Sequence, residues 1–290
     1  MQTKNFIEKT EMKPITELVL PIDKFSDWIF DQTKICDTTK MSEGVFKGKS
    51  ISSRITFKFG GGLLVPFDKT VLLALNSEYN ADNEFVSLQR LFETLGGGNH
   101  LTDKMKVELL KSVRKLMETY VKIDMTELVQ NCYKSKITTV EGMLLPCKIV
   151  TTEINSKITE STIHLLGNSP IFQVADIKNQ IMRLPCNLIS ALPLRSTEST
   201  ISLAWFLLER VGEIVGSHSS ERKKRVHKLS TSILFETIFE KCGFTGLDKE
   251  KRRNLLNNIK KILEHFQNYK LIPSFEIIKK NGKNYSIEIS

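Results

Sequence analysis

The stretch GFTGLDKEKRRNLLNNIKKILEHFQNYKLIPSFEII, residues 243–278, decides how the C-terminal part of this chain folds. On a helical wheel of about 100° per residue, the apolar side chains of residues 248–266 share one sector of about 120°. They are Leu255, Leu256, Ile259, Ile262, Leu263 and Phe266. The opposite side carries Arg253, Asn254, Asn257, Lys260 and Lys261. The spacing predicts an amphipathic helix over 248–266 whose exposed face has Glu250 and Glu264 near its ends and no acidic residue at its centre.

The exposed face of this helix has the residue types that recognise DNA. A solvated helix usually interleaves Glu with Lys, because pairs four residues apart stabilise it by about 0.2–0.5 kcal/mol. Arg and Asn can make paired hydrogen bonds to guanine and adenine edges in the major groove, whereas Lys suits phosphates. A basic helix face taken alone is more often a solvated surface, so its context matters. We expect base reading by Arg253, Asn254, Asn257 and Lys261, and a backbone contact by Lys260.

The elements around this helix predict a compact unit. An apolar helix is expected over 199–216, and a second from Ser230 or Thr231 to Lys241, which Gly243 ends as a C-terminal cap residue. Strands flank Asn281-Gly282 after the basic helix, and this dipeptide is a strong hairpin signal. Three helices followed by a hairpin is the element order of a winged helix.

A similar order of elements occurs earlier in the chain. Alternating polar and apolar residues predict a strand at 51–59. Helices are expected at 68–77, 87–95 and 103–120, the last two capped by Ser87 and Thr102. A hairpin over 142–166, a helix over about 170–182 and a connector then lead to a boundary near 194–198.

The sequence therefore predicts an α+β protein with two winged-helix domains in tandem. A weakly patterned N-terminal segment, residues 1–50, is expected to be a partly mobile lead-in. The first domain is expected at 51–195, with an extended β-hairpin, and the second at 196–290, as the principal DNA-binding domain. A length of 290 residues is comfortable for two domains of about 100–200 residues each.

Positive charge is concentrated near the C-terminus. The net charge is +9, yet residues 217–290 hold 16 Lys and Arg against 8 Asp and Glu, which leaves only +1 for the rest. Clustered Lys and Arg displace counterions from phosphates. By itself, ERKKRVHK (221–228) is equally well explained as a solvated linker. Together with the hairpin tip KKNGK it predicts contacts to the DNA backbone by Arg222, Lys223, Lys224, Arg225, Lys228, Lys279, Lys280 and Lys283.

The helix over 103–120 has an outer face of mixed charge. The wheel places Lys104, Lys111 and Lys115 outward, among Glu108 and Glu118. These lysines are candidates for secondary DNA contacts. The same face is also suited to pairing with another copy of the chain.

The sequence shows no recognisable catalytic or metal-binding constellation. Neither glycine triplet, at 60–62 or 96–98, is followed by the Gly-Lys-Ser/Thr of a phosphate loop. The five histidines are scattered, and no His-Glu-x-x-His or Gly-x-Ser-x-Gly motif occurs. We expect no catalytic residue, no metal and no cofactor.

The cysteines and the hydropathy pattern indicate a cytoplasmic protein. The five cysteines lie far apart with no C-x-x-C pair, which favours free thiols in a reducing compartment. No apolar run reaches the length of about 18 residues that a membrane span needs. The N-terminus has no signal-peptide pattern. We expect no membrane partner.

Residues 60–290 resemble the tandem winged-helix replication initiators of plasmids and related mobile elements. In the first domain the similar phrases are VPFDKTVLLALNSEY, VSLQRLFETLG and LTDKMKVELLKSVRKLMETYVKID. In the bridge to the second domain the phrase is STIHLLGNSPIFQVADIKNQIMRLPCNLISALPLRSTESTISLAWFLLERV. The resemblance implies binding to repeated duplex sites at the element's origin and recruitment of host replication proteins. It also implies base reading by the third helix of the second domain, and a first domain that mediates dimerisation and additional DNA contacts.

The function that we expect is non-enzymatic: a sequence-specific double-stranded DNA-binding protein that initiates replication at the origin of a plasmid or mobile element. A winged-helix transcriptional regulator needs the same duplex binding, and the sequence does not separate the two. A third hypothesis is a DNA-processing enzyme with an unrecognised metal site, which would turn over DNA or nucleotides with magnesium or manganese.

Overall fold

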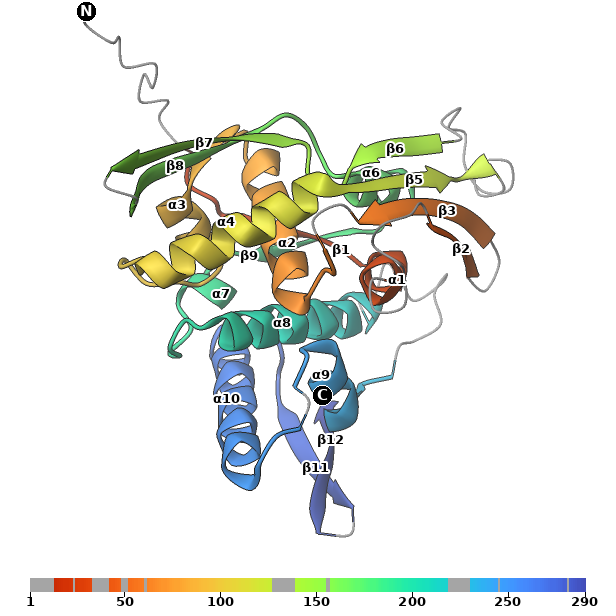
Figure 1. Ribbon diagram of the computed structural model, residues 1–290. Coiled ribbons are helices and arrows are strands. Elements are labelled where there is room, and N and C mark those ends of the chain that lie inside the picture. Colours follow the sequence, from red (N-terminus) through yellow and green to blue (C-terminus); the bar gives the residue numbers. More distant parts are fainter. Residues whose placement is uncertain are drawn as a thin grey trace, which may run out of the picture.

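In the residues that it describes, the computed structural model of the protein combines helices with four small antiparallel sheets, an α+β architecture. It describes residues 13–22, 24–32, 42–47, 52–59, 62–126, 139–154, 157–218, 230–244, 246–280 and 282–290. In Figure 1, α8 (Glu198–His218) crosses the middle of the molecule. The elements before α8 lie above it, and the elements after α8 lie below it.

The upper unit contains three helices and a hairpin in the expected order. These three helices are α2 (Pro66–Asn80), α3 (Leu88–Thr94) and α4 (Asp103–Glu118). The side chains of Ser87 and Thr102 accept hydrogen bonds from the backbone N–H groups of Arg90 and Met105, which confirms both expected caps. The short strand β4 (Phe85–Ser87) pairs with β8 (Lys157–Leu165), which pairs with β7 (Cys147–Ile154).

A four-stranded sheet, which the sequence did not predict as a unit, also belongs to the upper part. Its order is β2-β3-β5-β6, from β2 (Ser42–Lys47), β3 (Ser52–Phe59), β5 (Thr119–Asp124) and β6 (Thr139–Met143). The strand expected at 51–59 is present as β3. In β5, Val121 and Ile123 are buried and Lys122 is exposed, so alternation sets which face of this strand meets the core.

The lower unit follows α8 with a short strand, two helices and a hairpin. These are β10 (Ser232–Leu234), α9 (Phe235–Lys241), α10 (Lys249–Asn268), β11 (Phe275–Lys280) and β12 (Lys283–Ile289). The helix expected from Ser230 or Thr231 instead begins at Phe235, because Ile233 is buried and pairs with Ile287 of β12. Gly243 ends α9 with a φ of 74°, as expected of a cap residue.

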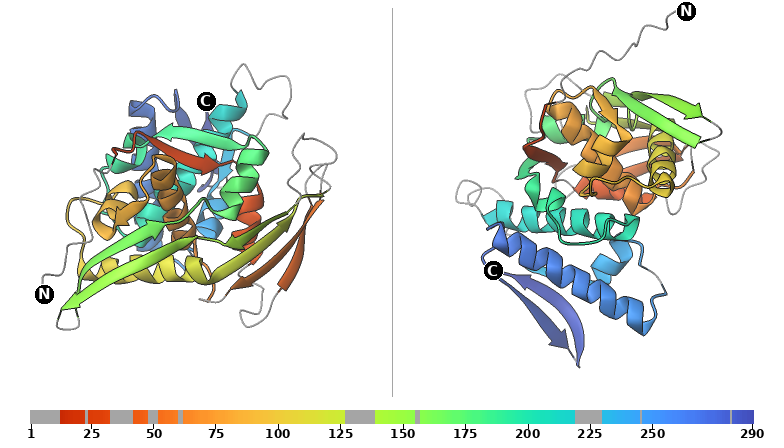
Figure 2. Two further views of the ribbon diagram at one scale, coloured as in Figure 1. Left: turned by 90° about the horizontal axis from the view of Figure 1, so that it is seen from above. Right: turned by 90° about the vertical axis from the view of Figure 1, so that its left-hand side faces the viewer.

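The two units share one strand order. In the upper unit the order is β4-β8-β7, and in the lower unit it is β10-β12-β11. In both, the short strand before the second helix pairs with the last strand of the hairpin. The four-stranded sheet and β7–β8 lie on the same side of α8 as the rest of the upper unit and point to opposite sides of the molecule (Figures 1 and 2).

The N-terminal residues that the structure describes pack with the upper unit, in the region where the sequence predicted a weakly patterned, partly mobile lead-in over residues 1–50. Strand β1 (Glu17–Pro21) pairs with β9 (Ile181–Pro185), and Leu18 and Leu20 are fully buried. Helix α1 (Lys24–Gln32) follows β1. The helix expected over about 170–182 is shorter, because α6 (Pro170–Ile177) ends before Asn179, whose φ of 51° turns the chain into β9.

One hydrophobic cluster runs through both units. Helix α8 connects them: Trp205 and Leu208 face the upper unit, whose cluster includes Leu72 of α2. Helices α9 and α10 pack on α8 from below. The sequence-derived boundaries at 50 and 195 remain predictions, and the shared core means that α8 supports the elements on both sides of it.

Candidate nucleic-acid interface

Helix α10 buries the apolar side chains that the helical wheel placed in one sector. Ile259, Ile262, Leu263 and Phe266 are fully buried, Leu255 is 7 % exposed, and Leu256 is partly buried against the same cluster. The helix begins at an N-cap, Asp248, whose side chain accepts a hydrogen bond from the backbone N–H of Lys251 at 2.7 Å. This hydrogen bond lowers the pKa of the Asp248 carboxyl below its usual range. The buried apolar residues and the Asp248 cap fix which side of α10 faces solvent.

The expected base-reading residues all lie on the solvent side of α10. The side chains of Arg253, Asn254, Asn257 and Lys261 are exposed. Within the described residues, none of these four has a hydrogen-bond or ion-pair partner on its side chain. Lys260, expected to contact the backbone, is exposed too, and its ammonium lies 3.5 Å from the Glu264 carboxylate. The four proposed readers are therefore available to a ligand.

The first turn of α10 adds basic residues that the sequence reasoning left out. Lys249, Lys251 and Arg252 are exposed. The guanidinium carbon of Arg252 lies 5.3 Å from the ring centroid of Phe239 on α9. The run KEKRR in the sequence indicates these basic residues, because the first helical turn places them beside the exposed face that carries the expected base-reading residues.

The hairpin β11–β12 extends to the same end of the molecule as the first turn of α10 (Figure 1). Lys279 and Lys280 are exposed near its tip. The ammonium of Lys280 lies 5.1 Å from the ring centroid of Tyr285, which is 46 % exposed and was not among the expected site residues. The backbone of Lys283 begins β12, and its side chain lies outside the described residues.

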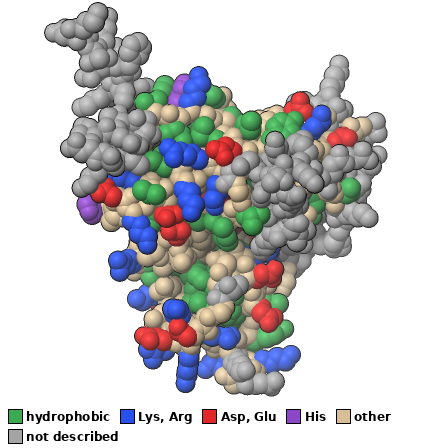
Figure 3. Space-filling view, viewed as in Figure 1, with side chains coloured by type: hydrophobic (Ala, Val, Ile, Leu, Met, Phe, Trp, Pro, Cys, Tyr) green, Lys and Arg blue, Asp and Glu red, His purple; other side chains and the backbone are tan. Residues whose placement is uncertain are grey.

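Lysine and arginine side chains gather along the lower part of the molecule, where α10 and the hairpin lie, with a few acidic side chains between them (Figure 3). This agrees with the excess of positive charge in residues 217–290. The loop residues Arg222, Lys223, Lys224, Arg225 and Lys228 lie outside the described residues, so their expected phosphate contacts stay predictions.

On α4 the three lysines expected to make secondary DNA contacts differ in exposure. Lys104 and Lys111 are exposed, as predicted. Lys115 is turned inward: its ammonium lies 2.9 Å from the carboxylate of Asp68 and donates a hydrogen bond to the Leu63 carbonyl oxygen at 3.1 Å. Asp68 is 2 % exposed, so its charge needs a cation close by. Lys115 is therefore corrected to a structural residue, and Arg114, which is exposed, takes its place on the outer face.

The residues that the structure describes bear on metal binding, thiol chemistry and membrane crossing. Among them, no group of three or more His, Cys, Asp or Glu residues is arranged to hold a metal ion. Burial raises the pKa of the Cys147 and Cys242 thiols to about 12, which disfavours their thiolates. In the same residues, none of the helices combines the length and the apolarity that crossing a membrane requires.

The fold and this surface define an α+β protein with a basic helix-and-hairpin face. No family model matches the chain, and no curated protein matches it in sequence. Two solved structures of domains 2 and 3 of RctB are similar to it. One, a selenomethionine derivative, has 11 % identity and a TM-score of 0.44 over 91 % of this chain and 97 % of that chain. The other has 10 % identity and a TM-score of 0.47 over 86 % and 91 %. At these values the likeness assigns neither a family nor a function.

Proposed function

We propose that this protein is a non-enzymatic, sequence-specific double-stranded DNA-binding protein that initiates replication at the origin of a plasmid or mobile element. The observation that carries the proposal is the solvent face of α10. Its Arg253, Asn254, Asn257 and Lys261 side chains are exposed and have no partner within the described residues. Phosphate binding alone would not require the two asparagines, whereas adenine recognition uses them.

The surroundings of α10 support a winged-helix mode of binding. Helix α10 is the third in the order α8-α9-α10. The hairpin that follows it reaches the end of the molecule where the first turn of α10 lies. In a helix-turn-helix arrangement the recognition helix enters the major groove and its N-terminal residues meet the base edges. We propose that the hairpin, with Lys279 and Lys280, contacts phosphates beside that groove.

The upper unit has the same strand order, and we propose that it is a second winged-helix domain. Its α4 presents Lys104 and Lys111, with Arg114, to a secondary stretch of DNA. A homodimer through this unit, and host replication proteins as further partners, are part of the proposal through the family resemblance. The proposed roles of these partners in initiation rest on that resemblance.

Footprinting on the DNA that flanks the gene, at several salt concentrations, tests the proposal. We expect protection of repeated sites, and replication of a minimal replicon that carries the gene and those repeats. Repression of a promoter without replication would favour a transcriptional regulator. Magnesium- or manganese-dependent turnover of DNA or nucleotides by the purified protein would contradict a non-enzymatic role.

The hairpin lysines give a prediction that concerns phosphate contacts. The double variant Lys279→Ala/Lys280→Ala is expected to weaken binding to all duplexes alike. Each phosphate contact contributes about 0.9 to the slope of log K against log salt, so the slope should fall by about 2. Fluorescence anisotropy with a target duplex and a random duplex, across a salt series, measures both effects.

A lysine far from the hairpin serves as the matched control for this variant. Lys122 on β5 is half-exposed and lies 3.1 Å from the Glu141 carboxylate. Lys122→Ala should leave the salt slope as it is in the wild-type protein. If the hairpin variant changed affinity for the target duplex only, the hairpin would be reading bases, contrary to the proposal.

A further inference from the structure

Helix α1 carries ion pairs to both units. Its Asp27 carboxylate lies 2.6 Å from the ammonium of Lys69 on α2, and its Asp31 carboxylate lies 2.5 Å from the ammonium of Lys241 on α9. Lys69 also donates to both carboxylate oxygens of Glu209 on α8, at 2.9 and 2.7 Å. Helices α1, α2, α8 and α9 therefore meet at one charged cluster, which lines a cavity of about 60 Å³.

The two ends of this cluster differ in burial. The side chains of Lys69 and Glu209 are 14 % and 11 % exposed. Burial disfavours the charge on Lys69, but Glu209 and Asp27 hold the pKa of Lys69 above its usual value. Burial also raises the pKa of Glu209 to about 7, against the attraction of Lys69. The pair of α1 with α9 is more open, since Asp31 and Lys241 are 37 % and 26 % exposed.

The segment before α1 is fixed to the upper unit by main-chain hydrogen bonds. Strand β1 pairs along its whole length with β9. The Asn83 side chain bonds to the backbone N–H and carbonyl of Lys13, at 2.8 and 2.9 Å. The backbone N–H of Val19 donates to the Ser77 hydroxyl at 2.9 Å. These bonds join the described residues 13–21 to elements of the upper unit.

The other end of α1 reaches α10 through α9. Lys241, which pairs with Asp31, is the last residue of α9. On the same helix, the ring of Phe239 lies under the guanidinium of Arg252. Arg252 precedes Arg253, one of the proposed base readers. Helix α9 therefore contacts both α1 and the first turn of α10.

We propose that β1 and α1 form a strap that is fixed to the upper unit and holds α9, and through it α10, at a set angle to that unit. Asp31 and Lys241 are positioning residues in this strap: they contact no ligand and act through α9. The proposal goes beyond the proposed function, because it concerns the coupling of the two units whatever the lower unit binds.

Hydrogen–deuterium exchange of the full-length protein without DNA tests the strap. Asp31→Asn and Lys241→Met should each speed amide exchange in α9 and in the first turn of α10 by about 2–5-fold, the size expected for losing a partly exposed ion pair. Exchange in α4 should not change. The double variant Asp31→Lys/Lys241→Asp restores the pair with reversed charges and should return the protection.

A matched surface pair in the upper unit supplies the control. Glu141→Gln removes the partner of Lys122, a half-exposed pair between β5 and β6, and should leave α9 and α10 unchanged. Wild-type exchange of α9 and α10 in both single variants would overturn the proposal, and so would a reversed pair that exchanges as fast as the single variants. Because no DNA is present, a failure of the proposed DNA binding would not affect the outcome.

Discussion

Replacing Arg253 and Asn257 with Ala is expected to reduce sequence preference more than any other change on the surface. The two side chains lie four residues apart on the exposed face of α10, so both can reach neighbouring base pairs. Each good paired contact discriminates by about 1–3 kcal/mol, or about 5–150-fold. The ratio of affinities for the target duplex and a random duplex should fall by that factor in each variant, as measured by competition binding at fixed salt.

The matched control for Asn257→Ala is Asn268→Ala, the same chemical change at the last residue of α10. Asn268 is exposed but lies at the end of α10 away from the hairpin tip. Its replacement should leave the affinity ratio unchanged. Equal losses on target and random DNA from Arg253→Ala and Asn257→Ala would mean that α10 contributes charge alone, which would contradict base reading.

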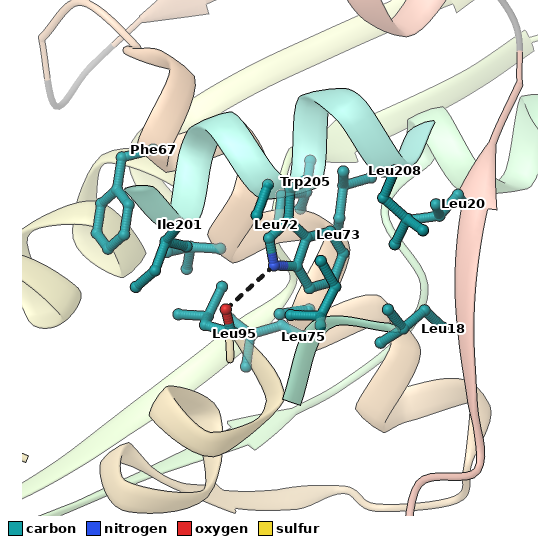
Figure 4. Packing of buried hydrophobic residues seen from close by; sticks show 14 of the residues in the cluster. Leu18, Leu20, Phe67, Leu72, Leu73, Leu75, Leu95, Ile201, Trp205 and Leu208 are labelled. Atoms are coloured by element: carbon teal, nitrogen blue, oxygen red, sulfur yellow. Dashed lines mark hydrogen bonds between the residues drawn. The ribbon is translucent and has the colours of Figure 1, made fainter. Parts of the chain in front are cut away.

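Replacing Trp205 with Ala is expected to cause the largest loss of stability. The Trp205 side chain is 1 % exposed on α8, and its indole Nε1 donates a hydrogen bond to the Leu95 carbonyl oxygen at 3.3 Å (Figure 4). It packs in the cluster with Leu72 and Leu75 of α2. Truncating a buried Trp to Ala typically costs about 3–5 kcal/mol, because the lost contacts leave a cavity. Urea unfolding followed by far-UV circular dichroism measures the loss.

Two further variants separate the causes of that loss. Trp205→Phe keeps an aromatic ring but removes the hydrogen-bond donor, and should cost less than Trp205→Ala. Val107→Ala changes a side chain that is 52 % exposed on α4 and should stay within about 0.5 kcal/mol of the wild-type protein. A Trp205→Ala protein as stable as Val107→Ala would show that α8 does not hold the two units on one core.

Local sequence signals predicted most helices and their caps. The wheel for residues 248–266 gave the buried seam and the exposed face of α10, because helical periodicity alone separates them. Ser87 and Thr102 were identified as caps because a side-chain oxygen at that position satisfies a free backbone N–H. The same local reasoning gave Gly243 as a cap residue and Gly282 as a hairpin-turn residue, and both have a positive φ.

Local sequence patterns gave wrong predictions for elements whose pairing partners lie far apart in the chain. The strand Ser232–Leu234 looked like the start of a helix, because its pairing with β12 is fixed by residues more than fifty positions later. The wheel for α4 pointed Lys115 outward, and only the buried Asp68 of α2 explains why it turns in. Strand β1 was missed for the same reason, since β9 is about 160 residues away.

By itself the sequence determined the class of the fold, the orders α2-α3-α4-hairpin and α8-α9-α10-hairpin, and the side chains on the exposed face of α10. These depend on periodicity, caps and turns, which act over a few residues. Only the tertiary structure decided that the N-terminal strand and helix join the upper unit, that Lys115 is structural, and that Asp31 and Lys241 connect α1 to α9. Each of these depends on burial and charge pairing between distant segments, which no local pattern records.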